Sequence, residues 1–225
     1  ALIENTTGSY NVAIGGFALD ANTTASNNTA VGYNSLGANT TGTVNTAVGT
    51  DALRSNTTAN HNTAVGYKAL DVNTTGTLNT GLGSNALLLN TTGSNNTAVG
   101  FGSLDSNTTG IENVSLGSLS SDAGTIASYN VAVGHSALTT NVASDKNTAI
   151  GHSALANLSS ATQADGFNVA VGYVAGAAIT TGQKNVLVGV GSGDAITTAD
   201  NNTAIGHLSL SENTTGSENT AVGQG

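Results

Sequence analysis

Residues 62–78 read NTAVGYKALDVNTTGTL, and residues 79–83 begin the same pattern again as NTGLG. The recurring element is an Asn that is followed four residues later by a Gly, with an aliphatic residue directly before the Gly. A short fixed period is typical of solenoid proteins, in which each repeat forms one structural unit and stacks on its neighbours. The fold therefore depends on how regularly this stretch recurs along the chain.

The stretch recurs thirteen times, always at a step of seventeen except for one longer step between Asn147 and Asn168. The longer step predicts a four-residue insertion within residues 155–164. Because no change in composition marks a boundary, we expect a single continuous solenoid segment over residues 1–225. The copies begin at residues 11, 28, 45, 62, 79, 96, 113, 130, 147, 168, 185, 202 and 219.

We number the places of the repeat from one to seventeen, starting at this Asn, and the consensus is N-T-A-V-G-x-x-A-L-x-x-N-T-T-G-x-x. Places one and five never vary, place two is Thr or Val, and place four is Val, Ile or Leu. Place eight is Ala or Ser, and place nine is mostly Leu. Invariance at these places indicates structural constraints, whereas places six, seven, ten and eleven vary in size and charge.

Each repeat predicts a short strand followed by a bend and a turn. A repeat of this length is too short for a pair of helices, and places one to five alternate with the period of a strand. We expect the β-branched residues of places two and four to face the core. In NTTG, Asn can cap its own backbone and Gly can take a positive φ. The fold class is therefore all-β, a parallel β-solenoid or β-roll of about thirteen coils that stack at about 4.8 Å.

Stacking explains the invariant residues. An Asn at the same place in every coil can form an amide ladder along the stack, and Gly at place five permits a tight corner or a close approach of two backbones. On this assignment Val65→Asp should disrupt the coils on both sides of it. The predicted structural ladder consists of Asn11, Asn28, Asn45, Asn62, Asn79, Asn96, Asn113, Asn130, Asn147, Asn168, Asn185, Asn202 and Asn219.

The third place is mostly Ala and carries no charge in any copy, although it faces away from the core expected above. An uncharged column of small residues is unusual on a solvated face, so we expect it to pack against another chain. The predicted oligomer face consists of Ala13, Ala30, Ala47, Ala64, Ala98, Ala132, Ala149, Ala170, Ala204 and Ala221.

Charge and hydropathy exclude some partners. The chain has four Lys and Arg residues against thirteen Asp and Glu residues, for a formal net charge of −9, so it lacks the basic surface that nucleic acid requires. No apolar run approaches the ~18 residues of a membrane span, so we expect no membrane insertion in this segment. The chain has no Cys and therefore uses no disulfide.

The array NTAVGYxALxxNTTGxx resembles the seventeen-residue repeats of phage tail-fibre-like proteins, and the likeness covers essentially the whole chain. More distantly, NVAVG at residues 130–134 is similar to the head repeats of trimeric autotransporter adhesins. Those heads are left-handed parallel β-rolls that associate as trimers, so the resemblance implies a left-handed coil and a homotrimer. The period differs from the shorter adhesin repeat, and we expect residues 1–225 to hold no stalk, anchor or chaperone segment.

Place six carries most of the rings and His residues of the chain. In the first half of the chain it alternates between small residues and rings, which predicts either packing of rings over the small residues or a surface that recognises a sugar or a protein. His135 and His152 are one coil apart, where their rings could stack or share a metal. The predicted recognition column consists of Tyr33, Tyr67, Phe101, His135, His152, Tyr173 and His207.

The remaining chemistry is sparse. A metal site needs three or four placed ligands, and the Asp residues at place ten are too few for a calcium-binding solenoid. No Ser-His-Asp set, paired carboxylates or phosphate-binding loop stands out from the repeat. We therefore expect no cofactor and no enzymatic activity.

These observations predict a structural shaft of an extracellular fibre, on a virion tail or a cell surface, that self-associates as a homotrimer or fibre. Such a shaft could present a surface to a cell-surface glycan or protein receptor. The alternative is a secreted solenoid that recognises ice or glycan through a flat Thr or aromatic face.

Overall fold

A computed structural model describes residues 1–160, 162 and 164–225, and it divides the chain into two compact units. Unit 1 is Ala1–Ile111 and unit 2 is Glu112–Gly225. Two residues of the predicted insertion, 161 and 163, lie outside the described range. No helix occurs in the part of the chain that the structure describes, so the described residues hold no helix that could span a membrane.

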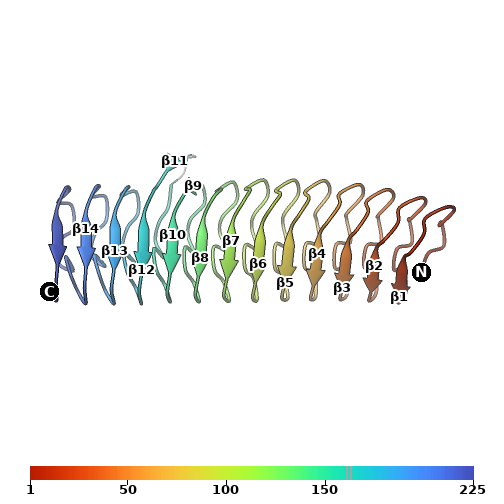
Figure 1. Ribbon diagram of the computed structural model, residues 1–225, viewed down its shortest axis with the longest axis horizontal. Coiled ribbons are helices and arrows are strands. Elements are labelled where there is room, and N and C mark those ends of the chain that lie inside the picture. Colours follow the sequence, from red (N-terminus) through yellow and green to blue (C-terminus); the bar gives the residue numbers. More distant parts are fainter. Residues whose placement is uncertain (161, 163) are drawn as a thin grey trace. The chain divides into compact units, whose positions relative to one another are not determined.

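Both units are built from short parallel strands that occupy places two to four of successive repeats (Figure 1). The strands of unit 1 are β1 (Val12–Ile14), β2 (Thr29–Val31), β3 (Thr46–Val48), β4 (Thr63–Val65), β5 (Thr80–Leu82) and β6 (Thr97–Val99). The corresponding strands of unit 2 are β7 (Val114–Leu116), β8 (Val131–Val133), β10 (Thr148–Ile150), β12 (Val169–Val171), β13 (Val186–Val188), β14 (Thr203–Ile205) and β15 (Thr220–Val222).

The register of pairing follows the repeat. Within unit 1 each strand pairs in parallel with the next, so that Ala47 lies opposite Ala64 and Val48 opposite Val65. Across the longer step in unit 2, Thr148 still pairs with Val169, so the register of the main sheet is kept. There β9 (Ser144–Asp145) and β11 (Ala164–Asp165) form a separate two-stranded pair. The predicted fold class is confirmed: each unit is a parallel β-solenoid with one strand of the main sheet in each repeat.

The face of the strand that points inward differs from the one we expected. The Ala side chains of place three are fully buried in the interior coils, whereas Val65 at place four is 37% exposed. They pack with the Ala of place eight and the Leu of place nine, as Ala64, Ala69 and Leu70 do in one repeat of the unit 1 core. Where Leu at place nine fills the narrow coil, a small residue stands at place three. In the repeat of unit 2 that has Gly193 at place nine, Leu187 occupies place three and is fully buried.

The predicted oligomer face is therefore wrong. Eight of its members are fully buried inside their own chain, and the remaining two, Ala13 and Ala221, are partly buried. The premise of the Val65→Asp prediction fails for the same reason, because Val65 faces outward and this substitution places a charge on the outer surface. The eight fully buried members are Ala30, Ala47, Ala64, Ala98, Ala132, Ala149, Ala170 and Ala204.

The Asn residues of place one form the expected ladder. In unit 1 their side chains make more hydrogen bonds to backbone groups than to other side-chain amides. The side-chain oxygen of Asn45 accepts the N–H of Asn62 at 2.9 Å, and the Nδ2 of Asn62 donates to the Gly76 carbonyl at 2.8 Å. In unit 2 the amides also bond to each other directly, as Asn185 Nδ2 does to Asn168 Oδ1 at 3.2 Å. Each buried amide thus satisfies backbone groups that the strand leaves unpaired.

A second Asn ladder lies at place twelve in unit 1. Asn56 Nδ2 donates to Asn39 Oδ1 at 2.9 Å, and Asn73 Nδ2 donates to Asn56 Oδ1 at 3.0 Å. Asn73 also caps its own turn by donating to the Gly76 carbonyl at 2.9 Å, as expected. In unit 2, Leu158, Ile179 and Ile196 occupy place twelve and extend the apolar core instead.

The turns use positive φ at unexpected places. The Gly of place five has the predicted close approach: Gly66 has a φ of 138°, and a Cβ there would overlap the carbonyl oxygen of Gly83. The Gly of NTTG, such as Gly76, does not take the positive φ that we expected. Non-Gly residues at places seven, nine and seventeen take it, as Lys68, Leu70 and Leu78 do at 55°, 54° and 60°.

Candidate recognition surfaces

The outer face of the main sheet carries the same few residue types in every repeat and no charged side chain. It consists of places two and four, which we call the sheet face, and these places hold only Thr, Val, Ile and Leu in every repeat. Val65, Leu82 and Ile150 on this face are 37%, 36% and 38% exposed. Rows of half-exposed aliphatic side chains without charge are typical of surfaces that contact a partner.

In unit 1 the place-six side chains alternate between rings and small residues. Tyr33, Tyr67 and Phe101 are each about half exposed, at 55%, 51% and 56%. The ring of Phe17 meets that of Tyr33 edge-on, with centroids 5.6 Å apart, and Lys68 Nζ lies 5.4 Å from the centroid of Tyr67. The three predicted members in unit 1 thus form a row on every second coil.

In unit 2 the same column forms a closed stack. The rings of His135 and His152 are 5.2 Å apart with an interplanar angle of 13°, and those of His152 and Tyr173 are 5.3 Å apart at 24°. Ser136 Oγ lies 3.0 Å from His135 Nδ1. His207 does not join this stack, because Val190 occupies place six between it and Tyr173. The ring faces in unit 2 are therefore used by neighbouring rings.

A metal shared by His135 and His152, the alternative to stacking of their rings, would need at least a third ligand. Over residues 1–160, 162 and 164–225, no group of three or more His, Cys, Asp or Glu side chains is placed to hold an ion. The pair of rings is held together by stacking.

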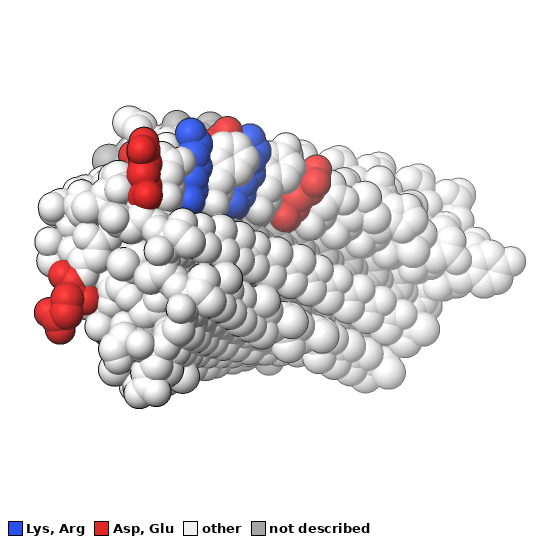
Figure 2. Space-filling model, turned by 60° about the vertical axis from the view of Figure 1, so that its left-hand side comes forward, with Lys and Arg blue, Asp and Glu red and all other residues white. Residues whose placement is uncertain are grey.

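The residues of place seventeen form a ridge that we did not expect from the sequence. All its residues have positive φ, and in unit 2 it carries both basic residues of that unit, Lys146 and Lys184. Figure 2 shows basic and acidic side chains following one another along one ridge, with a broad uncharged surface beside it. Lys146 Nζ lies 2.8 Å from Asp165 Oδ1 and 5.2 Å from the centroid of Phe167. The hydrogen bond that Lys146 donates to Asp165 raises the pKa of Lys146.

Unit 1 holds one buried ion pair. Arg54 Nε lies 2.8 Å from Asp71 Oδ1, and the Asp71 side chain is only 4% exposed. Burial raises the pKa of Asp71, and the positive charge of Arg54 opposes this shift. Asp51 lies near enough to raise the Asp71 pKa further. The pair anchors places ten of adjacent coils and leaves Arg54 little freedom to bind an anion.

The Thr residues of NTT have different roles. The hydroxyl of the first Thr donates to the next coil, as Thr74 Oγ1 does to the Thr91 carbonyl at 3.1 Å. The second Thr, such as Thr75, is exposed. One Thr row of this segment is therefore committed to the stack, and one faces solvent.

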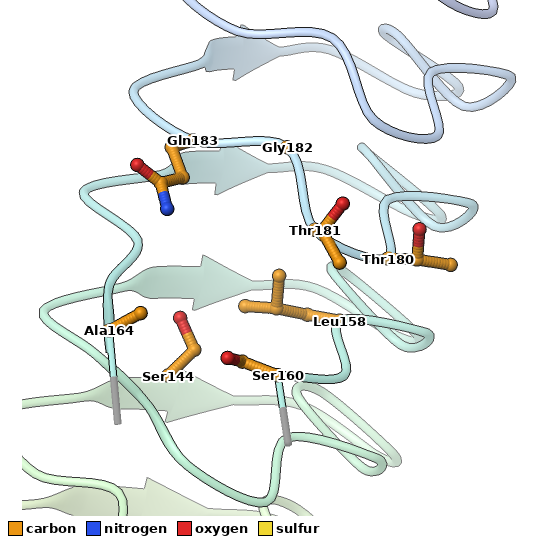
Figure 3. A pocket seen from close by; sticks show the side chains of 8 residues that line it. All are labelled: Ser144, Leu158, Ser160, Ala164, Thr180, Thr181, Gly182 and Gln183. Carbon is orange, nitrogen blue, oxygen red and sulfur yellow. The ribbon is translucent and has the colours of Figure 1, made fainter. Parts of the chain in front are cut away.

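A small cavity lies beside the insertion in unit 2. Figure 3 shows the side chains of Ser144, Leu158 and Ser160 pointing into the same space, with Gln183 at another edge of it. Its volume is about 60 Å³, whereas small-molecule sites are typically about 300–1,000 Å³. This cavity has room for water but not for a sugar or a cofactor.

Comparisons with known proteins give no relative for this chain. No family model matches it, and no curated protein or solved structure does.

Proposed function

We propose that this chain is a structural segment of an extracellular fibre, such as the shaft of a phage tail fibre or of an adhesin-like surface protein. On this proposal it lies outside the cell, on a virion tail or a cell surface, and self-associates as a homotrimer. It presents its place-six column to a glycan or protein receptor. No enzymatic activity belongs to the proposal.

The observation that carries the proposal is the uncharged sheet face. Each coil is closed internally by buried Asn and Leu residues, so the Val, Ile and Thr side chains of the sheet face contribute little to the core. Burying apolar surface stabilises an assembly by roughly 25 cal/mol per Å². A row of aliphatic side chains that extends over many coils therefore supports association of chains side by side, with three chains as the resemblance to trimeric fibres implies.

Two charges on this face test the assembly. In the double variant Val65→Asp/Leu82→Asp, two carboxylates stand on adjacent coils of the sheet face, and their burial in an interface without partners would cost several kcal/mol. The matched control is Thr75→Asp/Thr92→Asp, which puts the same charges on exposed residues of the same coils. Light scattering should show an oligomer for the wild type and the control but a monomer for the sheet-face variant.

Circular dichroism should show that both variants keep the strand signal of the wild type. A monomeric wild type at all concentrations would refute self-association. An oligomeric sheet-face variant would refute the assignment of the interface to this face. Thermal hysteresis by the wild-type monomer would favour the alternative, an ice-binding solenoid.

A further inference from the structure

The rings of unit 1 are arranged differently from those of unit 2. Tyr33, Tyr67 and Phe101 occupy place six of every second coil, and Thr50 and Ser84 occupy the coils between them. In unit 2 consecutive coils carry rings, and these rings cover each other. The rings of unit 1 have no place-six ring on the coils next to them.

The spacing of these rings is set by the backbone. The carbonyl of each place-six residue accepts the N–H of place seven in the next coil: Asp51 N donates to Tyr33 O at 3.0 Å, and Asn85 N donates to Tyr67 O at 2.9 Å. Neighbouring parallel strands lie 4.7–4.9 Å apart, so rings on every second coil are about 9.5 Å apart and the three rings span about 19 Å.

The small residues between the rings allow each ring to lie on the protein surface. A Cβ added to Gly16 would lie 3.4 Å from Cδ2 of Tyr33, so the Tyr33 ring extends over the neighbouring coil. Tyr33, Tyr67 and Phe101 keep between 51% and 56% of their surface exposed, so all three rings can be reached from solvent, as can Tyr173 at 55% in the unit 2 stack.

We propose that Tyr33, Tyr67 and Phe101 form a linear binding site for an extended, uncharged β-1,4-linked polysaccharide. The C–H face of a pyranose ring is apolar and stacks on the electron-rich face of an aromatic ring. An extended β-1,4-linked chain turns over at each sugar, so it presents the same face at every second sugar, a repeat similar to the ring spacing. An α-1,4-linked chain coils and does not stay in register with a straight row.

The surroundings of the row fit a neutral ligand. The place-six residues of unit 1 carry no charge, and the excess of acidic residues in the chain disfavours an anionic polysaccharide. Place seven supplies polar groups next to the rings: Asn34 Nδ2 donates to Asp51 Oδ1 at 3.0 Å, and Lys68 stands beside Tyr67. These groups can bond to sugar hydroxyls while the rings hold the chain.

This inference rests on the receptor-presenting role in the proposed function, and it does not require self-association. The test is isothermal titration of the whole chain with cellohexaose, chitohexaose and, as the coiled control, maltohexaose. At least one β-linked hexaose should bind, and maltohexaose should bind at least about tenfold more weakly, a difference of about 1.4 kcal/mol.

Variants locate the site. Tyr33→Ala/Tyr67→Ala/Phe101→Ala should lose at least about tenfold in affinity. Tyr67→Ala alone should weaken binding more than Phe101→Ala, because the middle ring contacts the ligand in every register. The matched control, Tyr10→Ala/Tyr129→Ala/Phe167→Ala, removes three exposed rings that lie outside the place-six column and should bind as the wild type does.

Three results would each overturn the inference: no binding of either β-linked hexaose, equal binding of maltohexaose, or equal loss of affinity in the place-six triple variant and the control triple variant. Light scattering of the same samples separates this inference from the assembly proposal. A monomer that binds supports the glycan site and refutes the assembly. An oligomer that does not bind refutes the glycan site alone.

Discussion

Asn62 offers the sharpest test of the ladder that holds the coils together. Its side chain is fully buried, its Oδ1 accepts the N–H of Asn79 at 3.0 Å, and its Nδ2 donates to the Gly76 carbonyl at 2.8 Å. The Gly76 carbonyl has a second donor in Asn73 Nδ2 at 2.9 Å. In Asn62→Ala the Gly76 carbonyl therefore keeps a partner, but the buried N–H of Asn79 loses its acceptor.

The size of the effect follows from these contacts. An unsatisfied buried donor costs about 1–3 kcal/mol, and the lost bond to Gly76 adds about 1 kcal/mol, so Asn62→Ala should lower the free energy of unfolding by about 2–4 kcal/mol. Thr63→Ala, one residue away on the sheet face, should change it by about 0.5 kcal/mol or less. Asn62→Asp keeps the acceptor but cannot donate to Gly76 and buries a charge, so at neutral pH we expect it to be less stable than Asn62→Ala.

Urea unfolding followed by circular dichroism measures the stability of the three variants. Since each coil of a solenoid contacts only its neighbours, amide hydrogen exchange should show the fastest new exchange at Asn79. Equal urea midpoints for Asn62→Ala and Thr63→Ala would refute the reasoning. Unchanged protection of the Asn79 N–H would also do so, because it would mean that another group accepts this hydrogen bond.

Two further predictions concern the corner and the buried ion pair. Gly66→Ala should destabilise unit 1 by at least about 2 kcal/mol, since a positive φ is strained for Ala. Gly76→Ala should destabilise it less, because other repeats have Ala at place fifteen. Thermal unfolding of the two variants measures the difference. The pKa of Asp71 is raised by burial against the opposing charge of Arg54, so its contribution to stability is full below the ordinary carboxyl pKa and is lost as pH rises through the raised value. The urea midpoint of the wild type, relative to that of Asp71→Asn, should therefore rise as the pH is lowered from 7 to 4. A difference that stays constant over this range would contradict the reasoning.

Much of the architecture is legible in the sequence because the constraints repeat. Asn at place one and Gly at place five never vary, and the structure confirms a ladder and a close backbone approach at these places. The constant period and its single longer step predict the strand register, including the pairing of Thr148 with Val169. Both conclusions depend on identical coils lying on one another, which a periodic sequence already implies.

The sequence also contains the Asn residues of place twelve. Only the structure shows that they have two roles, capping a turn and bonding to the next coil. Asn56 is visible as a turn residue, and capping is a local property that the spacing of NTTG predicts. Whether its amide also bonds to the next coil depends on the neighbours, and Ile179 occupies the same place in unit 2 as part of the core.

The sequence by itself determined the repeat, the strand and its register with neighbouring strands. Only the tertiary structure decided which side of the strand is inside. The period of two puts Ala64 on one side of the strand and Thr63 and Val65 on the other. Neither side of the strand carries a charge, so the sequence favours the side with the larger apolar residues for the core. The coil closes within a single repeat, and Leu70 packs in its interior with Ala64 and Ala69. The remaining space accepts a methyl group, so Ala64 is buried and Val65 faces outward, where a partner chain can reach it.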